Sequence, residues 1–182
     1  MTEDFLRTYK ATIDFWVEDL KVKPLVPPDV KEVKAPGVVM QDRNVKVAAA
    51  IVQHPPVRPA LAYRFDFQDR SIAFSGDTAP IEAMARLAEG VDLLVHEALY
   101  VRALEAYIRE RIAKGVPIRY DDYMAHMKID HSPVEDVGRI AQQAGVKTLV
   151  PAIDGIDDER WRNLAAKQFK GEIVVARDLL VL

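Results

Sequence analysis

"SIAFSGDTAPIEAMARLAEGVDLLVHEA", residues 71–98, predicts a strand, a helix and a second strand in direct succession. Apolar residues recur at helical spacing over residues 79–89, and Gly90 supplies a frequent type of helix stop. The apolar run at 91–98 predicts a buried strand. A strand, a helix and a strand of these lengths are typical of a layered fold in which helices cover a sheet.

The junction between the first strand and the helix contains Asp77 and Thr78. Asp77 has two interpretations: it caps the helix, as aspartate often does, or it binds a metal ion at the end of the strand. Thr78 is also a suitable cap, which would leave Asp77 available for another role.

The segments before this unit favour antiparallel strands, and those after it alternate between helix and strand. Residues 61–67 place Leu, Tyr and Phe on one side and Ala, Arg and Asp on the other, which predicts a half-buried strand. Besides the strand at 91–98, the predicted strands are 30–36, 37–42, 44–54, 59–69, 70–76, 146–152 and one or two within 171–182. The further predicted helices are 3–20, 101–114, 119–127, a helix within "HSPVEDVGRIAQQAG" (131–145) and 157–169.

The helix in 131–145 has the clearest end signals in the chain. Ser132 is the predicted N-cap, Pro133 occupies the first helical position and Glu135 completes a capping box. Gly145 is the predicted stop. Together the segments predict an α/β (α+β) layered sandwich, with a mixed β-sheet covered by helices. We expect a single domain over 1–182, in which residues 1–36 form an N-terminal helix and a Pro-rich connection.

The composition excludes some classes of site. The chain of 182 residues is long enough for one hydrophobic core, and it has no cysteine, so thiolate metal sites and disulfides are absent. Its net charge of −3, without a long basic run, does not indicate a nucleic-acid partner. We find no signal peptide or membrane-spanning segment, and therefore expect a cytoplasmic protein without a membrane partner.

Most of the candidate functional side chains lie where predicted strands end. His54 ends the strand 44–54, Asp77 follows "SIAFSG", and His96 and Glu97 end "VDLLVHEA". His131 precedes the helix that begins near Ser132. Loops at strand ends often carry function because a rigid scaffold positions them. Each residue also has an ordinary interpretation: His54 and His131 as solvated loop residues, and His96 or Glu97 as a loop support. His126 is interpreted as structural.

The ordered set "SGDT", "LVHEA" and "HSP…AGVKTLV" resembles the C-terminal half of the metallo-β-lactamase fold, in the ribonuclease Z and arylsulfatase-type branch. The resemblance covers residues 37–182. It implies that Asp77 bridges metal ions, that His54 is a metal ligand, and that Glu97 and His131 serve proton transfer or contact the scissile group. His96, Thr78 and Ser132 would support the site. The implied cofactor is zinc, or manganese or iron, and the implied substrates are small phosphodiesters or sulfate esters.

The sequence departs from this family at two places. The motif His-x-His-x-Asp-His is absent, and Ile153 occupies the position of the last histidine ligand, with Asp154 beside it. We therefore expect weak or absent metal binding by this chain alone. The chain would be a truncated or split hydrolase, a degenerate relative that acts as an assembly or ligand-binding module, or one half of a homodimer. A sheet face left without its usual cover predicts a second copy or a partner chain.

Overall fold

A computed structural model describes residues 7–23, 31–152, 158–177, 179 and 181. The chain divides into two compact units, Met1–Val33 and Lys34–Leu182. In the first unit, helix α2 (Lys10–Asp14) continues into a turn of π-helix, η1 (Phe15–Asp19). The described part of the predicted helix 3–20 is thus confirmed, and residues 1–6 lie outside the described residues. Its apolar side chains are about half exposed: Tyr9, Phe15, Trp16 and Leu20.

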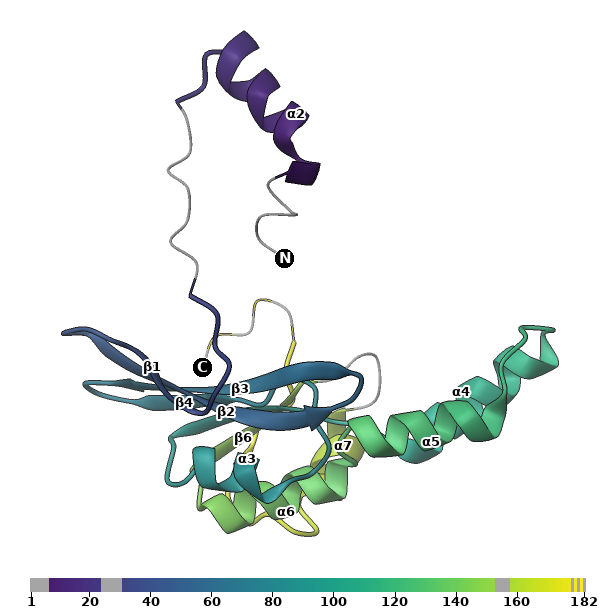
Figure 1. Ribbon diagram of the computed structural model, residues 1–182. Coiled ribbons are helices and arrows are strands. Elements are labelled where there is room, and N and C mark those ends of the chain that lie inside the picture. Colours follow the sequence, from purple (N-terminus) through teal and green to yellow (C-terminus); the bar gives the residue numbers. More distant parts are fainter. Residues whose placement is uncertain (1–6, 24–30, 153–157, 178, 180, 182) are drawn as a thin grey trace. The chain divides into compact units, whose positions relative to one another are not determined.

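The second unit is built on one seven-stranded mixed sheet with its strands in sequence order (Figure 1). The first four strands pair antiparallel, and the last four pair parallel. The bounds of the strands are β1 (Gly37–Gln41), β2 (Val45–His54), β3 (Val57–Phe67), β4 (Ser71–Phe74), β5 (Leu93–Glu97), β6 (Thr148–Ala152) and β7 (Glu172–Ile173). The predicted α/β architecture is confirmed. The predicted strand at 30–36 is wrong where it is described, since residues 31–36 form no strand.

The two faces of the sheet differ in how they are covered. Ala62 is fully buried, and its neighbour Arg64 donates to the carbonyl oxygens of Leu87 and Glu89 at the end of a covering helix. This face therefore packs under helices. The opposite face carries the aromatic residues predicted by the alternation of β3, with Phe65 in contact with Phe67 and Phe74. Phe67 and Phe74 are 42% and 43% exposed, so this face is only partly covered.

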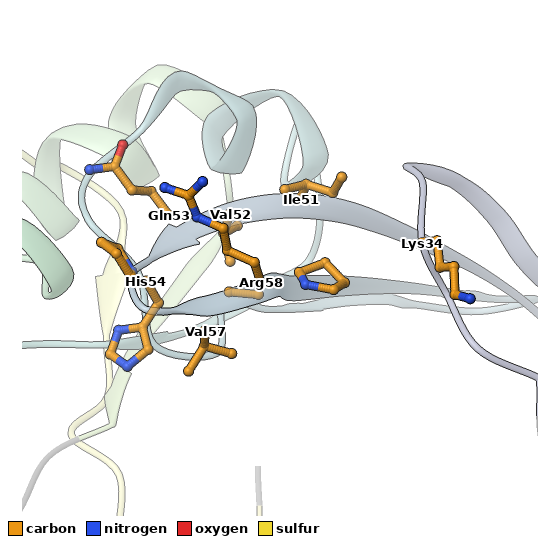
Figure 2. A pocket seen from close by; sticks show the side chains of 10 residues that line it. Lys34, Ile51, Val52, Gln53, His54, Val57 and Arg58 are labelled. Carbon is orange, nitrogen blue, oxygen red and sulfur yellow. The ribbon is translucent and has the colours of Figure 1, made fainter. Parts of the chain in front are cut away.

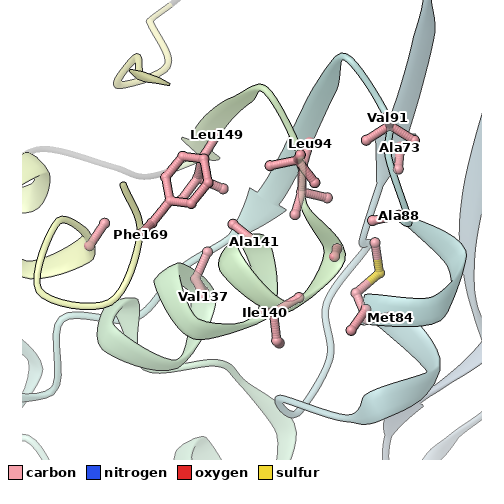
Figure 3. Packing of buried hydrophobic residues seen from close by; sticks show 14 of the residues in the cluster. Ala73, Met84, Ala88, Val91, Leu94, Val137, Ile140, Ala141, Leu149 and Phe169 are labelled. Carbon is pink, nitrogen blue, oxygen red and sulfur yellow. The ribbon is translucent and has the colours of Figure 1, made fainter. Parts of the chain in front are cut away.

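Three helices cover the first face: α3 (Glu82–Leu87), α6 (Val134–Ala144) and α7 (Asp158–Ala165). Figure 3 shows Met84 of α3 and Ile140 of α6 in one buried cluster with the strand residues Leu94 and Leu149. Gly138 lets α6 approach α7 closely, because a Cβ there would lie 2.4 Å from the carbonyl oxygen of Ala165. Burial of these apolar side chains is the main source of the stability of the unit.

The N-cap predicted at Ser132 is wrong, and of the two interpretations of Asp77 the helix cap does not hold. Helix α3 begins at Glu82 with Ile81 at its N-cap, so neither Asp77 nor Thr78 caps it. Helix α6 has Pro133 at its N-cap without a side-chain hydrogen bond, so Ser132 and Glu135 form no capping box. The Ser132 hydroxyl donates instead to the carbonyl oxygen of Thr78, and the Thr78 hydroxyl accepts from the N–H of Gln53. The predicted stop of α6 is confirmed, because Gly145 has the left-handed conformation.

Helices α4 (Val101–Ala113) and α5 (Tyr120–Asp130) form a hairpin that projects from the rest of the second unit (Figure 1). Its two ends are close to the candidate functional residues, since α4 follows Glu97 and α5 ends just before His131. Few of its side chains are buried, namely Ile108, Met124 and Asp130. Among the described residues, no helix is long and apolar enough to cross a membrane.

Candidate metal centre

The sheet topology brings the predicted residues to one edge. Strand β2 is antiparallel to β3, and β3 is antiparallel to β4, so β2 and β4 run in the same direction as β5 and β6. The carboxyl ends of these strands therefore meet. They carry His54 at the end of β2, Asp77 after β4 and Glu97 at the end of β5.

His54, Asp77 and His131 form a compact group of potential metal ligands. One donor atom of each residue lies within 4.8 Å of the others. The rings of His54 and His131 meet edge to face, with centroids 5.1 Å apart. The two histidines are half-buried and Asp77 is exposed. The sequence predicted two ligands here, and the structure offers three, which is the number of protein ligands that a catalytic zinc usually has.

Each of the two histidines has its Nδ1 atom next to an oxygen acceptor. The Nδ1 atom of His54 lies 3.1 Å from the backbone oxygen of Asp130, so it carries the proton and donates. The Nδ1 atom of His131 lies 3.3 Å from Oε2 of Glu97. In metal sites the second imidazole nitrogen commonly donates to such an oxygen, which leaves Nε2 available for the ion. Two imidazoles and a carboxylate thus fit a divalent transition metal.

Glu97 connects the two loops that carry Asp77 and His131. Its Oε1 atom accepts hydrogen bonds from the backbone N–H of Thr78, at 3.0 Å, and of Ser132, at 3.1 Å. Burial raises the pKa of Glu97, while these N–H donors and the charge of His131 act in the opposite direction. The carboxylate therefore fixes the relative position of the loops.

Thr78 and Ser132 add a second connection. The Ser132 hydroxyl donates to the carbonyl oxygen of Thr78 at 2.7 Å, and both residues are fully buried. The Thr78 hydroxyl accepts from the N–H of Gln53, which immediately precedes His54. Thr78 and Ser132 thus link the loops that carry Asp77 and His131, although neither caps a helix, and their supporting role stays a prediction.

The remaining histidines are not members of the ligand group. His96 is completely buried and its Nδ1 donates to the backbone oxygen of Glu97 at 2.6 Å. Burial lowers the pKa of His96 to about 4, so the ring is neutral near pH 7. His126 pairs with the buried carboxylate of Asp130 at 2.5 Å.

Sequence reasoning missed Asp130, whose backbone oxygen holds His54. No residue type signals such a contact, because any residue has a backbone carbonyl. Ile153 and Asp154, the positions where the family's last ligand would fall, lie outside the described residues.

Comparison with known families supports this site. Residues 11–152 match the family model described as "Beta-lactamase superfamily domain". The chain is 35% identical over 167 residues to ribonuclease Z of Mycobacterium avium, covering 88% of this chain and 54% of the relative. It is 30% identical over 187 residues to ribonuclease Z of Mycolicibacterium gilvum, covering 98% and 60%. The chain thus spans a little over half the length of these relatives.

Solved structures share the fold. The metallo-β-lactamase fold protein YhfI of Bacillus subtilis has a TM-score of 0.60 at 17% identity, over 90% of this chain and 60% of that one. The short form of human tRNase Z has a TM-score of 0.52 at 19% identity, over 82% and 47%. Together with the ordered motifs at the sheet edge, the family match and the curated relatives show that this chain belongs to the metallo-β-lactamase superfamily, in its ribonuclease Z branch.

Proposed function

We propose that this chain carries part of the metal site of a phosphodiester hydrolase that acts on RNA. The observation that supports this most is the convergence of His54, Asp77 and His131, with both Nδ1 atoms directed to oxygen acceptors. The names of the relatives favour RNA over the sulfate esters that the wider resemblance allows. The net charge of −3 does not exclude RNA, because binding depends on local rather than total charge.

In this proposal His54 and Asp77 hold a divalent ion, with zinc the first candidate and manganese or iron the alternatives. The bound ion would supply an activated water for attack on phosphorus. As the new P–O bond forms, the P–O bond to the leaving oxygen breaks, and that oxygen needs a proton. His131, held by Glu97, is placed to deliver it. The same position also allows His131 to act as a third ligand.

The experiment measures zinc and manganese stoichiometry together with hydrolysis of bis(p-nitrophenyl) phosphate and p-nitrophenyl sulfate. We expect Asp77→Asn and His54→Gln to lose bound metal, whereas the control Asp69→Asn, at an exposed turn, retains it. If His131→Ala still binds the metal, the result supports a role of His131 in proton transfer. If this variant loses the metal, the result supports His131 as a metal ligand. If the protein binds no metal and hydrolyses neither ester, the proposal that this chain catalyses hydrolysis is wrong. The alternative, a non-catalytic assembly or ligand-binding module, is then favoured.

We further propose that a partner chain or a second copy covers the aromatic face of the sheet and completes the metal site. This face exposes several large apolar side chains, and a large exposed apolar patch often marks an interaction surface. They include Met40, Ile51, Phe67 and Phe74. Light scattering tests the proposal: we expect a dimer that Phe74→Glu converts to a monomer. A wild-type monomer without bound partner would contradict it.

A further inference from the structure

Two neighbouring residues at the end of β2 bond to the last turn of helix α5. The Nδ1 atom of His54 lies 3.1 Å from the backbone oxygen of Asp130, and Nε2 of Gln53 donates to the backbone oxygen of Ile129 at 3.5 Å. Figure 2 shows the side chains of Gln53 and His54 on opposite sides of the strand. The last carbonyl groups of a helix have no partner within the helix. Side chains from both sides of β2 therefore supply donors to the end of α5.

This helix end suits a histidine that binds a metal ion. Helix α5 has 11 residues, and a helix carries a partial negative charge at its C-terminus. A proton on Nδ1 of His54 is therefore favoured next to the oxygen of Asp130. With Nδ1 protonated, the free lone pair of the ring is on Nε2, which can bind the ion. The contact with α5 thus selects the form of the ring that a metal site needs.

The carboxylate of Asp130 is buried at the same helix end. Asp130 is 1% exposed, and within the described residues no hydrogen bond reaches either carboxylate oxygen. In that part of the chain its ionic partner is His126, one helical turn earlier, whose Nδ1 atom lies 2.5 Å from Oδ2. A buried charge that loses its partner is strongly destabilised. Without His126 the carboxylate would turn towards water, and the backbone of the last turn would move with it.

We propose that His126 and Asp130 are positioning residues of the metal centre. They fix the last turn of α5, and the carbonyl oxygen of that turn holds the ring of His54 with Nε2 free for the ion. The inference rests on the proposed function, because it concerns how one proposed ligand is oriented. A purely structural His126 would stabilise the helix without any effect on the ring of His54.

The tautomer of His54 in the metal-free protein tests this proposal. Long-range proton–nitrogen NMR spectra of isotope-labelled protein show which ring nitrogen carries the proton, and the chain has four histidines to assign. The spectra are recorded at about pH 8, where an ordinary histidine is neutral. We expect the proton of His54 on Nδ1 in wild type. In His126→Leu we expect a mixture in which part of the protein carries this proton on Nε2.

Zinc affinity, measured by isothermal titration, gives a second measurement on the same variants. We expect His126→Leu to weaken zinc binding about 10–100-fold, as loss of an outer partner typically does. The side chain of His126 is 53% exposed, so its replacement should not disturb the core. Urea unfolding checks that every variant is folded.

Two variants are controls. In His126→Asn the amide nitrogen takes about the place of Nδ1 and can donate to Asp130, so we expect the wild-type tautomer and zinc affinity. Lys128→Leu introduces the same side chain at an exposed position two residues later on α5, and it should also behave like wild type. An unchanged tautomer and an unchanged zinc affinity in His126→Leu would overturn the proposal. Equal changes in His126→Asn or in Lys128→Leu would also overturn it.

Asp130→Asn tests whether the two side chains act together. Asparagine keeps the shape of the side chain but has no charge that needs a partner. His126→Leu should therefore shift the tautomer of His54 less in this background than in wild type, since residues in contact are not additive. Equal shifts in both backgrounds would contradict a joint role of His126 and Asp130.

This proposal and the proposed function fail in different ways. If wild type binds zinc but His126→Leu changes neither the tautomer nor the zinc affinity, the positioning role alone is wrong. If wild type binds no zinc but the tautomer of His54 still depends on His126, the proposed metal site is wrong and the hold of α5 on His54 stands.

Discussion

The Oε1 atom of Glu97 lies 3.1 Å from the backbone nitrogen of Ser132, a residue 35 positions later in the chain. The same oxygen accepts from the N–H of Thr78 at 3.0 Å. A single carboxylate oxygen thus joins the loop after β4 to the loop before α6. Since Asp77 precedes Thr78 and His131 precedes Ser132, this contact sets the spacing of two candidate ligands.

Glu97→Gln should separate the structural role of this side chain from its electrostatic role. The Gln side-chain oxygen can still accept from both N–H groups, so we expect little loss of stability. The negative charge beside His131 disappears, and loss of such an outer partner typically weakens metal affinity about 10–100-fold. Isothermal titration with zinc measures this affinity. Unchanged affinity would show that Glu97 does not act on His131.

Glu97→Ala is the comparison for stability. It leaves two buried N–H groups without their acceptor, at a cost of roughly 1–3 kcal/mol each. We expect urea unfolding to show a loss of about 2–6 kcal/mol, well above the loss in Glu97→Gln. Equal stability of the two variants would mean that the loops do not depend on this carboxylate.

The edge position of the site was predictable from the sequence, and the hydrogen bonds within it were not. Hydrophobic periodicity located β2, β4 and β5, and strand direction then placed His54, Asp77 and Glu97 together. Cap prediction failed because it uses only local spacing. The Ser132 hydroxyl bonds to Thr78 instead of its own helix, a contact 54 positions away. Such long-range choices depend on the completed fold.

His96 should make the stability of the fold sensitive to mild acid. Its folded pKa of about 4 lies below the usual 6.5, so the unfolded chain takes up the proton first as pH falls. Stability is therefore lost progressively from about pH 6.5 towards pH 4 and is fully present above this window. Urea unfolding at neutral pH and at about pH 5 should show the decrease, and His96→Gln should reduce it.

The protonation of His96 can be measured independently from its ring resonances in NMR spectra, which are assigned by comparison with His96→Gln. We expect the ring to remain neutral where an exposed histidine becomes charged. A titration midpoint near 6.5 would contradict the burial argument.

Gly138→Ala should destabilise the protein although alanine is the better helix former. A Cβ at this position would lie 2.4 Å from the carbonyl oxygen of Ala165, so α6 and α7 would have to separate. Overpacking of this kind typically costs about 1–3 kcal/mol. Gln143→Ala, on the exposed side of the same helix, is the control and should change the free energy of unfolding little. Equal effects in both variants would show that the helices can move apart freely.

Gly76→Ala should affect both stability and metal binding. Gly76 has a positive φ of 59°, and a Cβ there would lie 2.9 Å from the backbone oxygen of Leu61. The adjacent Asp77 would shift as the turn adjusts. Gly145→Ala is the matched control, because its φ of 65° is similar and the space around it is open. Both variants carry the conformational cost of roughly 1–2 kcal/mol, but Gly76→Ala adds the clash. We expect a larger loss in urea unfolding and weaker zinc binding for Gly76→Ala alone. Equal losses with unchanged zinc affinity would show that the turn does not position Asp77.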